Sequence, residues 1–241
     1  MAKTKTAFAA LDSRTPRFVR LVGALAAVAA VGGAAALHME HAGHVVTGMS
    51  NQVVWGLPHV FAIFLIVAAS GALNVASIAS VFGRTAYKPL APLSGLLAVA
   101  LLAGGLAVLV LDLGRPDRLT VAMTHFNFSS IFAWNVLLYS GFFAIVGAYL
   151  WTMLDRRMNG WSAAVGAGAF LWRLVLTTGT GSIFGFLVAR ETYHSAVMAP
   201  LFIAMSLAYG TAAFILVVSA LYRLAGRPLG DGVRGRLARL Q

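Results

Sequence analysis

The sequence predicts an all-α integral membrane protein, a polytopic bundle of about six transmembrane helices. Sixty per cent of the 241 residues are hydrophobic and only 10% are charged, whereas soluble domains contain about a quarter charged residues. Mean hydropathy is +0.84. The apolar residues form continuous runs long enough to cross about 30 Å of hydrocarbon, without the alternation typical of membrane strands.

Six apolar runs are expected to form the helices in chain order, within a single membrane domain of residues 1–241. Polar or turn-forming residues end each run, such as Arg84 after the second, Gly114 after the third and Asp155 after the fourth. The runs are 18–37, 53–82, 90–112, 129–154, 161–189 and 195–222, and a basic tail follows at 223–241.

The first run has two interpretations. Its basic start, its Ala-, Gly- and Val-rich stretch and its small residues near the end describe either an uncleaved helix or a cleaved secretory signal. We expect the uncleaved helix. The later runs have the same orientation in both cases.

Lysine and arginine residues are divided unequally between the two sides of the expected bundle. Fourteen of the 18 lie before or in the first turn of the first run, or after an even-numbered run. Because positive charge is retained on the cytoplasmic side, both termini are expected in the cytoplasm. These charges mark the ends of apolar runs, so membrane lipid is an expected partner and nucleic acid is not.

The polar chemistry gathers on the opposite, outer side. His38, His41 and His44 recur every three residues, but only Glu40 offers a further ligand, so no metal site is expected. The chain contains no cysteine and therefore no thiolate ligand for an iron–sulfur cluster or attachment point for c-type haem. All six histidines lie near this side: His38, His41, His44, His59, His125 and His194.

One face of the second run is polar. His59, Ser70, Asn74 and Ser77 lie within about 60° of one another on a helix of about 100° per residue. In hydrocarbon such a stripe must face other helices or a cavity. For the two serines we expect helix–helix hydrogen bonds, whereas His59 has either a structural role or one in ligand binding or proton transfer.

Arg173 stands near the middle of the fifth run, with Thr177 and Thr180 on the same helix face. Ionisable residues inside a membrane are candidates for function. Two roles stay open for Arg173. It either bridges to backbone carbonyls near Gly181, or forms a proton path towards the inner side together with Asn74 and Thr177.

Asp112 and Arg115 end the third run at its outer edge, where Pro116 stops the helix. They either pin the helix end as an i, i+3 pair or form one wall of a pocket.

Asn135 and Tyr139 share a face of the fourth run. A quinone needs hydrogen-bonding groups at its ring and apolar access for its tail, and the candidate residues are Trp55, His59, Asp112, Arg115, Asn135 and Tyr139.

Six short segments carry a resemblance to a known family. They are Trp55-Gly56-Leu57-Pro58-His59, Gly71-Ala72-Leu73-Asn74, Tyr87-Lys88-Pro89, Leu111-Asp112-Leu113-Gly114-Arg115-Pro116, Phe126-Asn127-Phe128-Ser129-Ser130 and Ala133-Trp134-Asn135. With them, the sequence resembles the NrfD/PsrC family of quinone-interacting membrane subunits from about Val46 to Tyr222. Within that family it looks most similar to the DsrP-type subunit of the Dsr sulfite-reductase-associated complex.

The resemblance implies a subunit that binds menaquinone or ubiquinone near the outer face of the bacterial inner membrane, in anaerobic respiration or sulfur metabolism. It implies electron exchange with a separate periplasmic four-cluster iron–sulfur protein and further redox subunits. Haem, iron–sulfur clusters and catalytic residues are accordingly not expected in this chain itself. Family members usually have eight or more spans, so the chain is expected to be shortened at its C-terminus.

Two other classes stay open. A haem b-type membrane anchor needs two axial histidines facing each other within the bilayer, and only His59 lies well inside a run. A six-helix transporter or proton channel is the other class. Such proteins often show internal repeats and broken helices; no repeat is clear in this sequence, although residues 177–181 contain glycines that favour a break.

Overall fold

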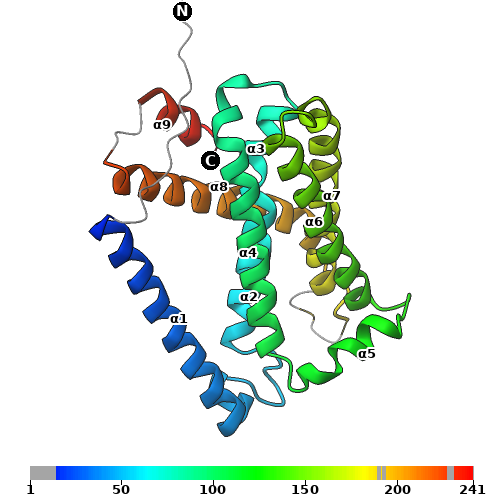
Figure 1. The fold of residues 1–241 in the computed structure, drawn as a ribbon. Coiled ribbons are helices and arrows are strands. Elements are labelled where there is room, and N and C mark those ends of the chain that lie inside the picture. The colour runs from blue at the N-terminus through cyan, green and yellow to red at the C-terminus, as the bar shows by residue number, and fades with distance from the viewer. Residues whose placement is uncertain (1–14, 189–190, 192–193, 227–230, 241) are drawn as a thin grey trace, which may run out of the picture.

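The computed structural model is a bundle of helices (Figure 1), and it describes residues 15–188, 191, 194–226 and 231–240. No strand occurs in this part of the chain, so the all-α fold class is confirmed. The basic residues Lys3, Lys5, Arg14, Arg190 and Arg227 lie outside the described residues. The helices are α1 (Pro16–Ala42), η1 (His44–Thr47), α2 (Leu57–Ala72), α3 (Asn74–Ser80), η2 (Thr85–Leu90), α4 (Ala91–Leu111), η3 (Pro116–Arg118), α5 (Leu119–Thr124), α6 (Ile131–Leu154), η4 (Asn159–Trp161), α7 (Ser162–Gly185), α8 (Met198–Leu224) and α9 (Asp231–Ala238).

All six apolar runs form helix. Five helical segments are long and apolar enough to cross a membrane: Pro16–Ala42, Leu57–Ser80, Thr85–Leu111, Ile131–Leu154 and Met198–Leu224. The helix in the fifth run, α7, has 24 residues, which is enough for a span. Its glycines, hydroxyl residues and Arg173 make it less apolar than the other five.

The core lies between α2, α4, α6 and α7, with α2 packed most extensively against α4 and α8. Alanines supply much of the buried face of α2, and Ala62, Ala68, Ala69 and Ala72 are fully buried. Small side chains allow helix backbones to approach closely, which is how helices associate within a membrane. Larger side chains fill the space around them, including Ile66, Leu102, Phe142, Tyr149 and Leu176.

A hydroxyl group from α4 interrupts the second span at Leu73, between α2 and α3. In an unbroken helix the amide of Ala76 would bind the carbonyl of Ala72. Instead, the Ala76 N–H donates to Ser94 Oγ at 3.1 Å, and the Ser94 hydroxyl donates to the Ala72 carbonyl at 2.6 Å. Ser94 thus replaces one helical hydrogen bond with two and satisfies both backbone groups at the break.

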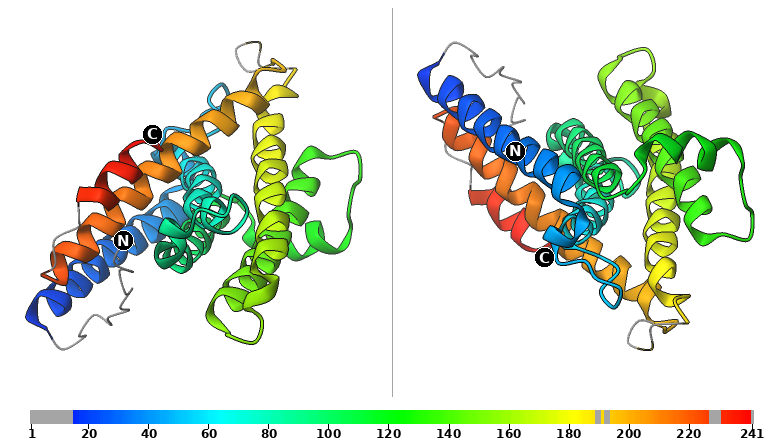
Figure 2. Two further views of the ribbon diagram at one scale, coloured as in Figure 1. Left: turned by 90° about the horizontal axis from the view of Figure 1, so that it is seen from above. Right: turned by 90° about the horizontal axis from the view of Figure 1, so that it is seen from below.

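Two glycines form the contact at which α8 crosses α2. A Cβ atom at Gly210 would overlap the backbone of Gly71 and Ala72, and a Cβ at Gly71 would overlap the carbonyl of Ser206. Seen from above, α8 runs lengthwise past α2 and α4, which are viewed nearly end-on (Figure 2). The backbone contact therefore lets α8 cross the bundle instead of running alongside it.

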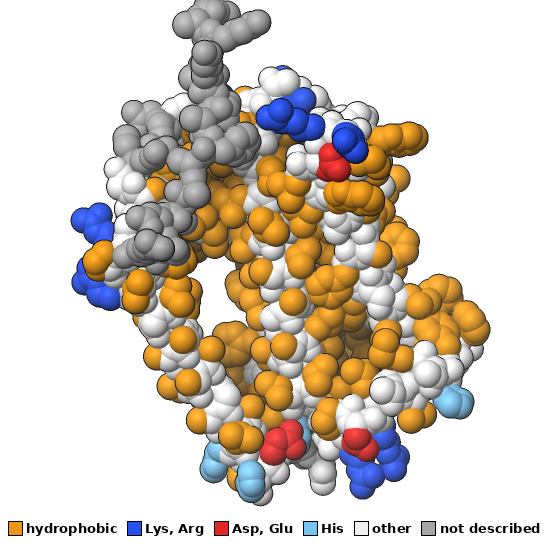
Figure 3. Space-filling model, in the orientation of Figure 1, with side chains coloured by type: hydrophobic (Ala, Val, Ile, Leu, Met, Phe, Trp, Pro, Cys, Tyr) orange, Lys and Arg blue, Asp and Glu red, His pale blue; other side chains and the backbone are white. Residues whose placement is uncertain are grey.

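Helix α1 stands apart from the rest of the bundle. Its most apolar stretch has no buried residues, and the space-filling view shows an opening between α1 and the other helices (Figure 3). In the same view lysine and arginine side chains lie at the end with η2 and α9 and beside the start of α1, and histidines lie at the opposite end, next to a further group of basic side chains. We call these the basic end and the histidine end.

Candidate functional site

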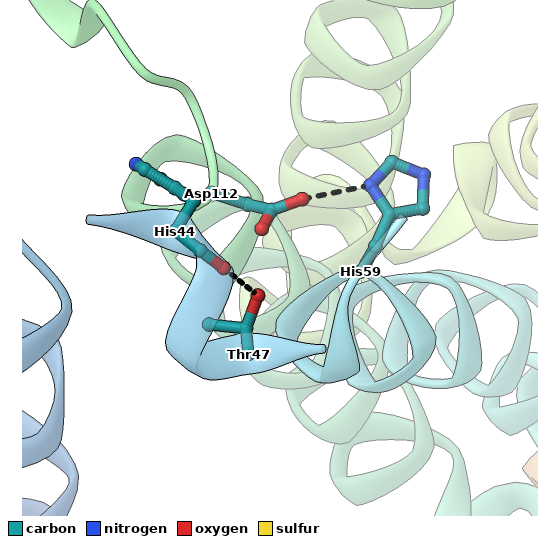
Figure 4. A network of polar contacts seen from close by, with 4 residues as sticks. All are labelled: His44, Thr47, His59 and Asp112. Atoms are coloured by element: carbon teal, nitrogen blue, oxygen red, sulfur yellow. Dashed lines mark hydrogen bonds and ion pairs between the residues drawn. The ribbon is translucent and has the colours of Figure 1, made fainter. Parts of the chain in front are cut away.

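The start of α2 and the end of α4 meet at the histidine end and bring His59 and Asp112 together (Figure 4). His59 Nδ1 lies 3.1 Å from Asp112 Oδ2, and the two side chains are 16% and 6% exposed. Because an ionised carboxylate only accepts hydrogen bonds, Nδ1 carries the proton in this pair. In the neutral ring, Nε2 on the opposite side of the imidazole then keeps its lone pair.

The residues next to His59 and Asp112 in the sequence determine where these two side chains lie. Gly56 and Pro58 start α2, so His59 falls in its first turn. A side chain at position 56 would overlap Thr47 of η1, which packs against this helix start and is held by a 2.7 Å hydrogen bond to the His44 carbonyl. Asp112 caps the C-terminus of α4, directly before the turn that leads to Pro116. Each side chain is therefore held at a helix end.

An aromatic cluster packs against one face of the imidazole through Trp55. Trp55 stacks on His59 with ring centroids 5.2 Å apart and planes inclined by 8°. Phe184 of α7 meets Trp55 edge-on at 5.1 Å and lies 5.2 Å from Phe202 of α8. These contacts leave His59 little rotational freedom, so its second nitrogen is presented in one direction.

A cavity of about 660 Å³ lies beside the imidazole, between α2 and α8. Its wall is mostly apolar and aromatic, the composition typical of small-molecule sites. The sequence singled out only Trp55 and His59 among its lining residues. The others are Gln52, Val53, Val54, Val60, Ile63, Phe64, Val67, Phe184, Met198, Leu201, Phe202, Met205 and Tyr209.

The α8 residues of this wall carry no signal in the sequence, because Met, Leu and Phe within an apolar run are equally suited to lipid contact. Only the crossing of α8 over α2 turns these side chains towards His59. A site built from them was therefore not accessible to sequence analysis.

Three predicted quinone-site residues lie away from the cavity. Arg115 is exposed, and among the described residues no ion pair joins it to Asp112. Asn135 is 2% exposed and donates to the carbonyls of Ile131 at 2.9 Å and Gly179 at 3.2 Å, which ties α6 to α7. Tyr139 is buried one turn further along α6. Their part in quinone binding stays a prediction.

The residues of the predicted proton path fall into one buried region. Arg173 and Asn74 line a second cavity of about 320 Å³ between α3, α7 and α8. Thr177 lies beside it: its hydroxyl donates to the Arg173 carbonyl at 2.7 Å and contacts the Ser70 hydroxyl at 2.6 Å. Ser70 thus forms the expected hydrogen bonds to α7, and Asn74 bonds Thr211 of α8. The same expectation was wrong for Ser77, whose hydroxyl donates to the Leu73 carbonyl of its own span.

Known proteins resemble this chain over most of its length. The family model described as "Polysulphide reductase, NrfD" matches residues 45–228. The Hdr-like menaquinol oxidoreductase integral membrane subunit of Archaeoglobus fulgidus is 30% identical over 222 residues, which are 92% of this chain and 55% of that protein. A putative dimethyl sulfoxide reductase membrane subunit of Halobacterium salinarum is 31% identical over 226 residues, with 83% and 51% of the two chains covered.

A third relative is more distant. A selenate reductase subunit of Mesobacillus selenatarsenatis is 20% identical over 211 residues, covering 72% of this chain and 50% of the relative. The chain thus spans about half the length of the curated relatives it matches. No solved structure matches it. On the family match over residues 45–228, the chain belongs to the NrfD/PsrC family of membrane subunits.

Proposed function

We propose that this chain binds quinol or quinone in the cavity beside Trp55 and His59 and exchanges electrons with a partner subunit. Its relatives are named as subunits of oxidoreductases, one of them a menaquinol oxidoreductase. The observation that carries the proposal is the His59 ring, held by Asp112, in the wall of a largely apolar cavity.

The residues of the cavity fit a quinone in chemistry and size. About 660 Å³ of mostly apolar space accommodates a ring and the first part of its tail. Oxidation of quinol supplies two electrons and two protons. With Nδ1–H donating to Asp112, His59 Nε2 accepts a hydrogen bond from a quinol hydroxyl and is placed to take up its proton. Asp112 stabilises the imidazolium that results, so it acts as a positioning residue.

The electrons leave through other proteins in this proposal. The quinone is menaquinone or ubiquinone, and the partner is a periplasmic four-cluster iron–sulfur protein followed by further redox subunits. The chain itself binds no haem and no iron–sulfur cluster. It lies in the bacterial inner membrane with both termini in the cytoplasm, which places His59 near the outer face.

We further propose a proton path in the interior of the bundle, separate from the His59 cavity. We assign Asn74, Arg173 and Thr177 to a path from the interior towards the basic end. Two of these line one cavity, and Thr177 is hydrogen-bonded to the backbone of Arg173.

Binding of a hydroxyquinoline N-oxide, a quinol analogue, tests the site in the purified full chain. Trp55 stacks on His59, so analogue binding is expected to quench tryptophan fluorescence. His59→Ala and Asp112→Asn should each weaken binding by about tenfold or more, because a hydrogen bond to a charged group contributes about 1.5–3 kcal/mol. Quinol-linked activity of the assembled complex should fall in both variants while assembly persists.

Matched controls are available at the same end of the molecule. His41 and Asp117 are exposed residues of the same two types, so His41→Ala and Asp117→Asn should leave binding and activity unchanged. Normal analogue binding and turnover in both His59→Ala and Asp112→Asn would show that the pair is structural.

A further inference from the structure

Arg173 is a buried cation without a carboxylate to neutralise it. It is 2% exposed, in the middle of α7. Among the described residues the single ion pair joins His59 to Asp112, so no acidic side chain in this part of the chain pairs with Arg173. An ionised group inside hydrocarbon is stable only when a counter-charge or strong acceptors surround it.

Arg173 finds few acceptors on its neighbours. Nη1 reaches the carbonyl of Ser70 at 3.5 Å, the outer limit of a hydrogen bond, and Nε is buried without a partner among the described residues. The guanidinium carbon lies 4.9 Å from the centre of the Phe170 ring, so one face of the group has a cation–π contact. The hydrogen-bonding edge is largely unsatisfied.

The backbone around Arg173 is firmly held. The hydroxyl groups of Ser70 and Thr177 both bind the Arg173 carbonyl, at 3.2 and 2.7 Å, and contact each other at 2.6 Å. The packing of α2 against α7 thus holds the backbone from which the Arg173 side chain extends.

The cavity beside Arg173 is rich in hydrogen-bond donors. Asn74 Nδ2 donates to Thr211 Oγ1 at 3.3 Å, which leaves the hydroxyl proton of Thr211 and the second amide proton of Asn74 free to donate. The donor-bearing side chains of Arg173, Asn74 and Thr211 line this space of about 320 Å³, together with the acceptor oxygen Oδ1 of Asn74. Its remaining wall is apolar apart from Ser77, whose hydroxyl donates to the carbonyl of Leu73.

We infer that this cavity is an anion site, in which a small inorganic anion such as chloride neutralises Arg173. Donors in excess of acceptors around a fixed cation are the chemistry that binds an anion. Phe82, after α3, and Leu240, after α9, line the cavity on the side of the basic end. The arginines and Lys88 gathered there raise the local concentration of anions at the entrance.

Chloride titration of the purified full chain tests the inference. The protein is held in phosphatidylcholine nanodiscs in gluconate buffer, so that added chloride is the only small anion. Chloride should raise the unfolding temperature in a saturable manner, as expected for a ligand that binds the folded state. Bromide should substitute, and its anomalous scattering should locate it beside Arg173.

Two variants and one control define the result. Arg173→Gln should abolish the saturable response, and Thr211→Val should raise the half-saturating chloride concentration by about three- to tenfold, the value of one neutral hydrogen bond. Arg157→Gln removes the same charge from an exposed position at the basic end and should retain the wild-type response.

The inference is wrong if wild-type protein shows no saturable response, or if Arg173→Gln responds as Arg157→Gln does. Water alone would then solvate Arg173. If Arg173→Gln does not fold, an unchanged half-saturation in Thr211→Val overturns the inference instead. Quinol-analogue quenching in chloride-free buffer reports the His59 site separately, because that cavity shares no lining residue with this one.

Discussion

At the scale of single residues, Ser94 determines the shape of the second span. Its hydroxyl joins the amide of Ala76 to the carbonyl of Ala72. Ser94→Ala leaves both backbone groups without that partner, and an unsatisfied buried polar group costs about 1–3 kcal/mol. We expect a loss of that size in the free energy of unfolding, measured by denaturant titration in detergent.

Ser140→Ala is the matched control for this substitution. Ser140 lies on an exposed face of α6 and donates to the Val136 carbonyl within its own helix. Its loss should change the free energy of unfolding by less than about 0.5 kcal/mol. Equal stability of the two variants would contradict the role of Ser94, because α2 and α3 would then rejoin without cost.

The hydrogen-bond partner of Asp112 could not be predicted from the sequence. Asp112 is a candidate site residue because it lies at the edge of an apolar run. The nearby residue that suggested itself as its partner was Arg115. Its partner is His59, 53 positions earlier in the chain. That pairing depends on α2 lying antiparallel to α4, which spacing along one helix does not reveal.

At the scale of elements, the crossing of α2 and α8 depends on the absence of side chains at Gly71 and Gly210. Gly210→Ala forces the two backbones apart, because the new Cβ overlaps main-chain atoms that have no rotamer in which to move away. Overpacking of this kind costs about 1–3 kcal/mol. We expect a lower unfolding temperature together with weaker analogue binding, since α8 forms part of the cavity wall.

Gly147→Ala is the matched control for Gly210→Ala. It makes the same change within a helix, but without steric overlap. Gly147 lies within α6, and a Cβ there would meet nothing within 4 Å. Alanine is preferred to glycine in a helix by about 1 kcal/mol, so this variant should be as stable as the wild type or more so. If Gly210→Ala also gains stability, the helices do not touch at that point.

Helices were easier to predict than their arrangement. Continuous apolar runs specify spans, and all six runs form helices. The break at Leu73 was not predicted, because Ser94 acts on it from another helix. The crossing of α8 was not predicted either, since Gly71 and Gly210 also suit parallel packing. Both features depend on contacts between segments far apart in the sequence.

At the scale of the whole molecule, α8 is a wall shared by two cavities. Met198, Phe202 and Met205 face the cavity beside His59. Ile203, Leu207 and Thr211, spaced four apart on the opposite side of the helix, face the cavity beside Arg173. A displacement of α8 that widens one cavity narrows the other.

This geometry predicts antagonism between the two ligands. Saturating chloride should weaken quinol-analogue binding in fluorescence titrations, and by thermodynamic reciprocity the analogue should weaken chloride binding by the same factor. A coupling of about 1 kcal/mol corresponds to about fivefold in each affinity. Arg173→Gln should remove the effect of chloride, and equal analogue affinities with and without chloride in the wild type would contradict the coupling.

The His59–Asp112 bond has one more consequence, which concerns the register of the helices. It joins the first turn of α2 to the residue that caps α4, so it forms only when the two helices lie at the correct height. Sliding one helix by a single turn moves the carboxylate by about 5.4 Å, beyond the reach of a hydrogen bond. A chain inserted with that slip has the same hydrophobic content but no oriented imidazole, so ligand binding at His59 distinguishes correctly aligned molecules from misaligned ones.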